Sequence, residues 1–315
     1  MKAVYVDTLY SLFLALLLCD EEETIFFLGN HIDINIVRKL KIKFYLNEWF
    51  DLKICNKLLN KIRILMILRA KKIDILYFQD HIIYSQLFMK YFKGRIYLLE
   101  DGIKNYKLET PSRSLTKYGK IKEKIKSIVY RLQKRQRIMG LSDRVEKIIL
   151  TGLDKVPDII KEKTSIVNIE KLWEELSEQR KERIKEIFNI DVEKFKIIEQ
   201  EGKNIILFTQ PLSEDGILDE HEKIEIYSKI IKNYDITKLV IKIHPREKTD
   251  YRKYFKDVVV MDEKIPMELL RIMGIEFKEY VTIFSTAALT SNKNIKINWY
   301  GTKIHPKLLK WFGDI

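Results

Sequence analysis

Cysteine is almost absent from this sequence. The 315 residues contain two, Cys19 and Cys55, and neither lies in a CxxC pair or at zinc-ligand spacing from a histidine. Two cysteines cannot build a disulfide framework. We therefore expect a chain that folds without disulfides in a reducing compartment.

Long hydrophobic runs are also missing. The longest, residues 9–18, is interrupted only by Ser11, and it is half of the about 20 residues that cross a bilayer. Acidic residues 20–23 follow it, where a secretory signal would carry a small-residue cleavage site. We therefore expect neither a membrane-spanning helix nor a secretory signal.

Internal repeats, low-complexity linkers and metal-ligand patterns are likewise lacking. The sequence shows no unit of about 20–50 residues with a fixed consensus, which argues against a repeat array. It contains no Asp-x-Asp and no His/Asp cluster of metal-binding spacing. Nothing in the pattern therefore calls for a bound metal ion.

The composition itself is that of a globular protein. Hydrophobic residues make up 46% and charged residues 33% of the chain, enough to fill cores and keep the surface wet. A length of 315 residues favours two domains, with one large α/β domain as the alternative. The net charge of +13 predicts an anionic partner, which can be a nucleic acid, a membrane surface or a charged metabolite.

Short β-branched or aromatic runs alternate with segments of helical periodicity. Because these runs are apolar on both faces, they predict parallel strands covered by helices on both sides. The pattern occurs twice, so we expect an α/β domain over residues 1–168, a charged helical connector over 169–202 and a second α/β domain over 203–315. The predicted strands are residues 3–6, 25–28, 42–46, 75–78, 96–99 and 148–150 in the first half, and 205–209, 239–243, 258–261, 280–284 and 295–299 in the second.

One stretch, residues 113–147, is strongly basic. The ordinary interpretation is the solvated face of an amphipathic helix. The alternative is a helix that lies on an anionic membrane surface.

Polar residues follow the strands of the second half, where ligands of parallel sheets bind. His244, Pro245 and Arg246 come directly after one strand, and Ser285 and Thr286 come after another, just before an expected helix. The imidazole can protonate or hydrogen-bond a leaving phosphate, and two hydroxyls at a helix start can hold that phosphate. Taken alone, the His-Pro pair is equally well explained by local hydrogen bonding, and the Ser-Thr pair by helix capping.

Further candidates are acidic. Glu268 sits just inside an expected helix, where it can cap the helix or bind a ribose diol. The acid pairs Glu214-Asp215 and Glu100-Asp101 each precede a glycine at a strand end, a pattern that also marks ordinary turns. Because four strand ends in one half-chain each suit one part of a nucleotide, the conjunction indicates a nucleotide site.

The order of these motifs resembles the bacterial sialyltransferases, which share an acid–acid–Gly motif, an HP motif and an S-S/T motif. Here they read Glu100-Asp101-Gly102, His244-Pro245 and Ser285-Thr286. Within this group, the chain most resembles the lipooligosaccharide sialyltransferases, glycosyltransferase family 52. This resemblance rests on its length and on residues 6–12 and 209–212. Thr8-Leu9 departs from the Thr-Pro usual in that family.

The resemblance implies a GT-B fold, with two Rossmann-like domains facing an interdomain cleft. It also implies CMP-sialic acid as donor, a galactose-terminated glycan of lipooligosaccharide or capsule as acceptor, and inversion at the anomeric carbon. His244 would act on the departing phosphate, and either Asp215 or Asp101 would be the base, with a slight preference for Asp215. The residues implied in substrate binding are Gln210, Pro245, Arg246, Glu268, Ser285 and Thr286 in the second half, and Glu100, Gly102, Thr8 and Tyr10 in the first.

His31 and His81, which follow first-half strands, are either surface loop residues or contacts for an acceptor sugar. Because CMP leaves as a phosphate monoester, one proton and a few hydrogen bonds can handle its charge, and we expect no metal or other cofactor.

Two other interpretations are a GT-B enzyme with another donor, such as CMP-Kdo, and a basic nucleic-acid-binding protein. The second lacks any RNA-binding signature, zinc finger or aromatic-interleaved basic strand, so we expect no nucleic acid partner. The predicted location is the cytoplasm, with peripheral contact to the anionic inner face of the membrane; homodimer formation stays open.

Overall fold

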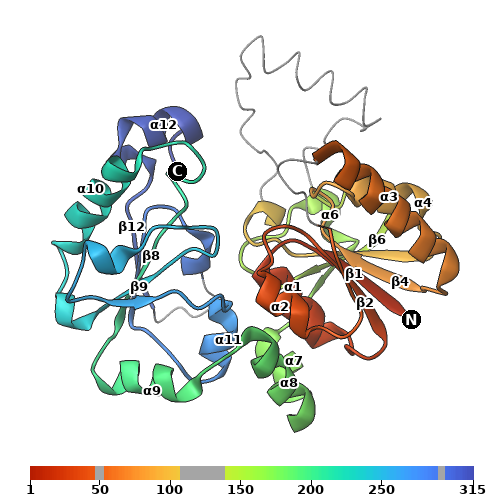
Figure 1. Cartoon of the computed structure of the whole chain (residues 1–315), viewed down its shortest axis with the longest axis horizontal. Helices are drawn as coiled ribbons and strands as arrows, with labels where there is room; N and C mark the ends of the chain where they lie inside the picture. Colours follow the sequence, from red (N-terminus) through yellow and green to blue (C-terminus); the bar gives the residue numbers. More distant parts are fainter. Residues whose placement is uncertain (47–52, 107–138, 290–294) are drawn as a thin grey trace. The chain divides into compact units, whose positions relative to one another are not determined.

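The computed structural model describes residues 1–46, 53–106, 139–289 and 295–315 (Figure 1). The chain divides into two compact units, Met1–Ile187 and Phe188–Ile315. The basic stretch 113–147 lies largely outside the described residues. Each unit is built on one parallel sheet, as the sequence predicts.

The first sheet has the strand order β3-β2-β1-β4-β5-β6-β7 among the described residues, with all neighbours parallel. The predicted runs form strands, and only the short edge strand β7 was not predicted. Its sequence, Thr-Ser-Ile, shows why, since it has two hydroxyl residues and no apolar run. The strands are β1 (Lys2–Val6), β2 (Thr24–Leu28), β3 (Lys43–Tyr45), β4 (Ile75–Phe78), β5 (Arg95–Leu99), β6 (Val145–Leu150) and β7 (Thr164–Ile166).

Helices cover both faces of this sheet, because alternate residues of a buried strand point to opposite sides. On one face Tyr5 and Phe27 pack on Phe88, with ring centroids 4.7 and 5.1 Å away. On the other, Phe13 of α1 lies 6.5 Å from Trp173 of α7. The helices are α1 (Leu9–Leu18), α2 (Ile34–Lys39), α3 (Lys53–Ala70), α4 (Ser85–Tyr91), the short η2 (Lys104–Tyr106), α6 (Asp158–Lys161), α7 (Ile169–Glu174) and α8 (Glu178–Phe188).

Helix α8 is fastened to the first unit by two arginines. Arg180 donates to the carbonyl oxygens of Leu16 and Cys19 at 3.0 and 2.7 Å, and Arg183 pairs with Glu21 at 2.8 Å. The division between the units therefore falls inside the segment 169–202, which is helical as expected.

The second sheet has the order β10-β9-β8-β11-β12 and is also parallel. Its strands are β8 (Ile205–Phe208), β9 (Leu239–Lys242), β10 (Val259–Met261), β11 (Glu279–Thr282) and β12 (Lys296–Trp299), each within a predicted run or one residue from it. The helical segments are α9 (Val192–Gln200), α10 (Glu220–Ile231), η3 (Ile236–Lys238), η4 (Tyr251–Lys253), α11 (Met267–Ile272), η5 (Thr286–Ala288), η6 (Thr302–Ile304) and α12 (Pro306–Phe312).

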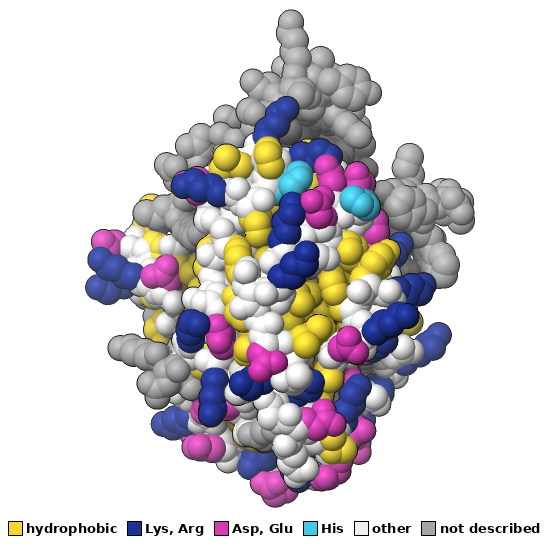
Figure 2. Space-filling view, turned by 90° about the vertical axis from the view of Figure 1, so that its left-hand side faces the viewer, with side chains coloured by type: hydrophobic (Ala, Val, Ile, Leu, Met, Phe, Trp, Pro, Cys, Tyr) yellow, Lys and Arg dark blue, Asp and Glu magenta, His cyan; other side chains and the backbone are white. Residues whose placement is uncertain are grey.

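The apolar run at residues 9–18 forms α1, a helix of 10 residues that is almost wholly buried. Within the described ranges, no helix has both the length and the apolar character needed to span a membrane. On the face drawn in Figure 2, Lys and Arg side chains are mixed with Asp and Glu side chains over the described surface.

Candidate active site

Both sheets reverse their strand order at one point, and the crevice outside the carboxyl ends there is the usual ligand site of open α/β sheets. In the first sheet the order turns between β1 and β4, and in the second between β8 and β11. The residues that follow these strands include Thr8 and Gln79 in the first unit, and Gln210 and Ser285 in the second. Topology thus places many of the predicted site residues at the two switch points.

Glu100, at the end of β5, is a buried structural carboxylate. Its side chain is 0% exposed, and its oxygens accept hydrogen bonds from Tyr10 Oη at 2.7 Å and Tyr106 Oη at 2.6 Å. The backbone amide and hydroxyl of Thr151 donate as well, at 2.6 and 2.9 Å. Because protein donors bond to both oxygens, Glu100 and Tyr10 hold β5, β6 and α1 together. Substrate contact by Glu100 stays a prediction.

Asp101 differs from its neighbour Glu100, since it lies beyond the carboxyl end of β5 beside a histidine. Its carboxylate accepts from Gln79 Nε2 at 2.6 Å and lies 3.2 Å from His81 Nε2, with Lys104 Nζ at 3.7 Å. Gly102 then turns the chain with a φ of 77°, a left-handed conformation that favours glycine. A carboxylate oriented by an amide and an imidazole is suited to accept a proton.

A second acid–histidine pair lies at the end of β1. Asp7 Oδ2 is 2.6 Å from His31 Nδ1, and Asp7 Oδ1 accepts from the His31 amide at 2.9 Å. The Asp7 side chain packs over Gly29, where an added Cβ would lie 2.0 Å from Oδ1. Thr8 caps α1 by accepting from the Ser11 amide at 3.3 Å. The first unit thus brings His31 and His81 beside acids at one sheet edge.

In the second unit, His244 stands at the end of β9 in a closed turn. Its Nδ1 accepts a hydrogen bond from the Arg246 amide at 3.2 Å, and its carbonyl accepts from the Glu247 amide at 2.9 Å. When Nδ1 accepts, the neutral ring carries its proton on Nε2. The turn therefore selects the tautomer that can donate through Nε2.

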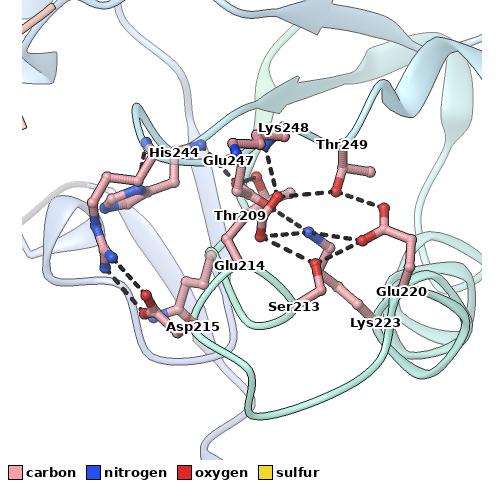
Figure 3. A network of polar contacts seen from close by, with 12 residues as sticks. Thr209, Ser213, Glu214, Asp215, Glu220, Lys223, His244, Glu247, Lys248 and Thr249 are labelled. Atoms are coloured by element: carbon pink, nitrogen blue, oxygen red, sulfur yellow. Dashed lines mark hydrogen bonds and ion pairs between the residues drawn. The ribbon is translucent and has the colours of Figure 1, made fainter. Parts of the chain in front are cut away.

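Asp215 and Arg246 form a two-pronged ion pair beside this turn. The guanidinium Nη1 and Nη2 lie 2.6 and 3.1 Å from the two carboxylate oxygens, and each side chain is 37% exposed. The bidentate geometry fixes Asp215 on Arg246, whose backbone amide bonds to His244 (Figure 3). Two predicted catalytic residues of the second unit are thus linked through Arg246.

Gln210 is bonded across the switch point to the residue before Ser285. The backbone amide of Gln210 donates to Tyr227 Oη at 2.8 Å, and the side-chain Oε1 of Gln210 accepts from the Phe284 backbone amide at 3.2 Å. Ser285 Oγ accepts from the Ala287 amide at 3.4 Å, and Thr286 is exposed. Within the described residues, which end here at 289, the expected helix start is one 3₁₀ turn, η5, over Thr286–Ala288.

Glu268 lies in the first turn of α11, which follows β10 and begins after Pro266. Its side chain is half-buried. Strands β8 and β9 stand between β11 and β10, so Ser285 and His244 lie two strands apart, about 10 Å in sheet width.

Two open depressions lie elsewhere. One of about 810 Å³ is lined by residues such as Asp74, Arg95 and Val145, and one of about 690 Å³ by residues such as Ile205, Glu279 and Lys296. Both sit at the amino ends of strands, opposite the switch-point edges. Among the residues that the structure describes, no three metal-ligating side chains come together.

Residues 21–308 match the family model of glycosyltransferase family 52. The chain belongs to glycosyltransferase family 52. The match covers most of both units.

One relative is similar in sequence over most of its length, and solved structures show the fold. An uncharacterised protein of Haemophilus influenzae is 44% identical over 270 residues, which cover 84% of this chain and 82% of that protein. An α/β-galactoside α-2,3-sialyltransferase of Photobacterium phosphoreum has a similar structure, with a TM-score of 0.58 at 16% identity over 94% of this chain and 90% of that one.

A 2,6-sialyltransferase of Photobacterium sp. JT-ISH-224, solved with CMP and lactose, gives a TM-score of 0.59 at 16% identity, covering 94% of this chain and 70% of that one. This family 52 member therefore has the GT-B fold of glycosyltransferases.

Sequence reasoning missed a buried cluster in this family 52 chain. Lys223, Glu214 and Glu247 form a polar network beneath the His244 turn (Figure 3). The available signal was weak, since Lys223 lies three residues from Glu220 in a charged helix and looks like a surface pair. Only the tertiary contacts show it to be buried.

Proposed function

We propose that this glycosyltransferase is an inverting sialyltransferase, which moves sialic acid from CMP-sialic acid to a terminal galactoside of a bacterial lipooligosaccharide or capsule. The observation that carries the proposal is the set of groups on one edge of the second sheet. His244 with Nε2 protonated, the Asp215–Arg246 pair and the Ser285–Thr286 hydroxyls all follow strands at that edge. The CMP and lactose named for the Photobacterium sp. JT-ISH-224 sialyltransferase support the same substrate classes.

The donor half of the reaction needs charge stabilisation on the phosphate. As the bond between the anomeric carbon and the phosphate oxygen breaks, negative charge grows on that oxygen. His244 Nε2–H donates to it, while Ser285 and Thr286 bind the other phosphate oxygens. Glu268 holds the ribose. Because one proton and these hydrogen bonds meet the charge of a monoester, the reaction proceeds without a metal ion.

The acceptor half needs a carboxylate that takes the proton of the attacking hydroxyl. Asp215 stands next to His244 and is partly exposed, although both oxygens pair with Arg246. Asp101 is oriented by Gln79 and His81. Both meet the chemical requirement, and Asp215 is the first choice because it is the more exposed.

Nucleotide-dependent melting tests the proposal. CMP should raise the melting temperature of the full chain in EDTA by several degrees, because a ligand that binds only the folded state stabilises it. CMP-sialic acid should transfer to lactose, N-acetyllactosamine or a sialylated glycan in the same buffer. UDP or GDP serve as controls.

Three results contradict the proposal in different parts. Stabilisation by UDP or GDP without CMP would reject a cytidine donor, and transfer from CMP-Kdo without transfer from CMP-sialic acid would change the sugar. Loss of transfer in EDTA that returns with Mg²⁺ would reject metal independence.

A further inference from the structure

Lys223 is a lysine in the core of the second unit. It lies in the first turn of α10, and its side chain is 0% exposed. Its Nζ is 3.0 Å from Glu214 Oε2, 3.5 Å from Glu220 Oε2 and 3.5 Å from Glu247 Oε1. Burying an ammonium costs several kcal/mol even when it is paired. A hydrophobic residue would fill the same space without that cost.

Two of the carboxylates that Lys223 binds hold the candidate catalytic groups. Glu247 is completely buried, and its Oε2 accepts from the backbone amide of His244 at 2.8 Å. The same oxygen accepts from the Thr209 hydroxyl at the end of β8, and Oε1 accepts from Tyr251 Oη at 2.7 Å. Glu247 thereby closes the His244 turn and ties it to the neighbouring strand.

Glu214 performs the corresponding task for Asp215, its neighbour in sequence. Its Oε1 accepts from the Lys248 amide at 2.6 Å, so it joins the loop after β8 to the loop after β9. The Asp215–Arg246 pair joins the same two loops from the exposed side. Figure 3 shows Glu214, Glu247 and Glu220 around Lys223, with Asp215 and His244 to one side of this cluster.

The charge balance makes Lys223 the critical member. Three carboxylates face one ammonium, and burial raises the pKa of Glu247 despite its hydrogen bonds. Arg246, a cation on the exposed side of the same loops, is already paired with Asp215. Removing the ammonium would leave Glu247 to protonate or to move, and in either case its hold on the His244 amide changes.

We propose that Lys223 is a positioning residue that, through Glu214 and Glu247, fixes Asp215 and His244 relative to each other and keeps His244 in its Nε2–H tautomer. This inference rests on the proposed roles of Asp215 and His244. It adds that the acid–base geometry is set by a buried ion cluster beneath the two loops.

The test compares Lys223→Met with Lys229→Met, which removes an exposed lysine from the same helix. We expect the Lys223 variant to lower kcat for transfer about 10- to 100-fold, as small misplacements of reacting groups do, and to leave the dissociation constant of CMP within about threefold. A second variant, Lys223→Met with Glu247→Gln, removes the buried ammonium together with the most buried carboxylate. This double variant should fold even if Lys223→Met alone does not. It should show the same 10- to 100-fold loss of kcat, about as large as small misplacements cause.

A spectroscopic readout separates this inference from the proposed function. Imidazole ¹⁵N spectra, assigned with His244→Asn, should show one Nε2–H tautomer in the wild type and in Lys229→Met. They should show averaged or altered nitrogen shifts in the Lys223 variants. This change is measurable whatever sugar the enzyme transfers, so absence of sialyl transfer in the wild type would reject the proposed function alone.

Folded Lys223 variants that keep both the wild-type tautomer and the kcat of Lys229→Met would overturn the inference. An equal loss of kcat and CMP affinity with an unchanged His244 spectrum would also overturn it, because that pattern belongs to general loosening of the unit.

Discussion

The hydrogen bond from the Arg246 amide to His244 Nδ1 gives this imidazole a defined proton position. A neutral ring with its proton on Nε2 can donate to a phosphate oxygen without first binding a proton from solvent. Pro245, which lies between the two residues, limits the backbone of the turn. One backbone contact thus decides what the side chain can do.

Replacing His244 with alanine should lower the transfer rate by a factor of about 100 or more, since a general acid contributes that much. CMP should still raise the melting temperature, because Glu268 and the 285–286 hydroxyls remain. Steady-state kinetics with CMP-sialic acid and thermal melting measure the two effects. The exposed His221 of α10 provides the control: His221→Ala should keep full activity, and a His244→Ala enzyme that does the same would remove His244 from the mechanism.

At the scale of elements, α10 joins the loops after β8 and β9. Asp219 and Glu222 form a capping box at its start, which fixes where the first turn begins. That turn then directs Lys223 and Glu220 toward the two loops. Burial alone would raise the pKa of Glu214, but hydrogen bonds from the Lys248 amide and Lys223 hold it at about 2.

This pKa predicts acid sensitivity of the second unit. A carboxyl whose pKa is lower in the folded state stabilises the fold above its unfolded pKa of 4.5, and loses that contribution as the pH falls toward about 2. Partial solvent access screens the contribution to about 1–2 kcal/mol. Hydrogen exchange of α10 amides, corrected for intrinsic rates, should show this loss in the wild type.

Glu214→Gln should flatten the dependence in that window, because the amide does not titrate. Glu225→Gln, which breaks the exposed pair with Lys229, should keep most of the pH dependence seen in the wild type. The same slope in wild type and Glu214→Gln would show that other carboxyls cause the acid sensitivity.

At the scale of the molecule, each unit offers one candidate base. Asp101 belongs to the first unit and pairs with His81, and Asp215 belongs to the second and pairs with Arg246. Both stand beyond carboxyl ends of parallel strands: Asp215 follows β8, at the point where the second sheet reverses its order, and Asp101 follows β5, next to β4 of the first sheet's reversal point.

Asp101→Asn and Asp215→Asn should be compared in the full chain. Asparagine keeps the size of each side chain and removes its basicity, so only the variant of the true base should abolish transfer while CMP still binds. We expect this of Asp215→Asn, measured by sialyl transfer and by CMP-dependent melting. Full activity of that variant with complete loss in Asp101→Asn would assign the base to the first unit.

Much of the fold could be predicted because a run of apolar residues indicates that the segment is buried. Strands such as β4 and β8 are apolar on both faces, and that pattern is typical of a parallel sheet with helices on both sides. The positions of His244 and Ser285 at strand ends follow from the same pattern. The edge strand β7 could not be predicted in this way, since Thr-Ser-Ile contains no apolar run. The pattern also gave no sign that the helical segment after Ser285 is a 3₁₀ turn.

The sequence by itself determined the two parallel α/β units and the groups that stand at their strand ends, because these depend on local pattern and chain order. Only the tertiary structure decided which acids are buried and what each one holds. Glu100 and Asp101 are adjacent in the sequence, yet one is locked among Tyr10, Tyr106 and Thr151 and the other faces His81. Partners for a charge come from segments far apart in the chain, and their desolvation and pairing exist only once those segments have packed together.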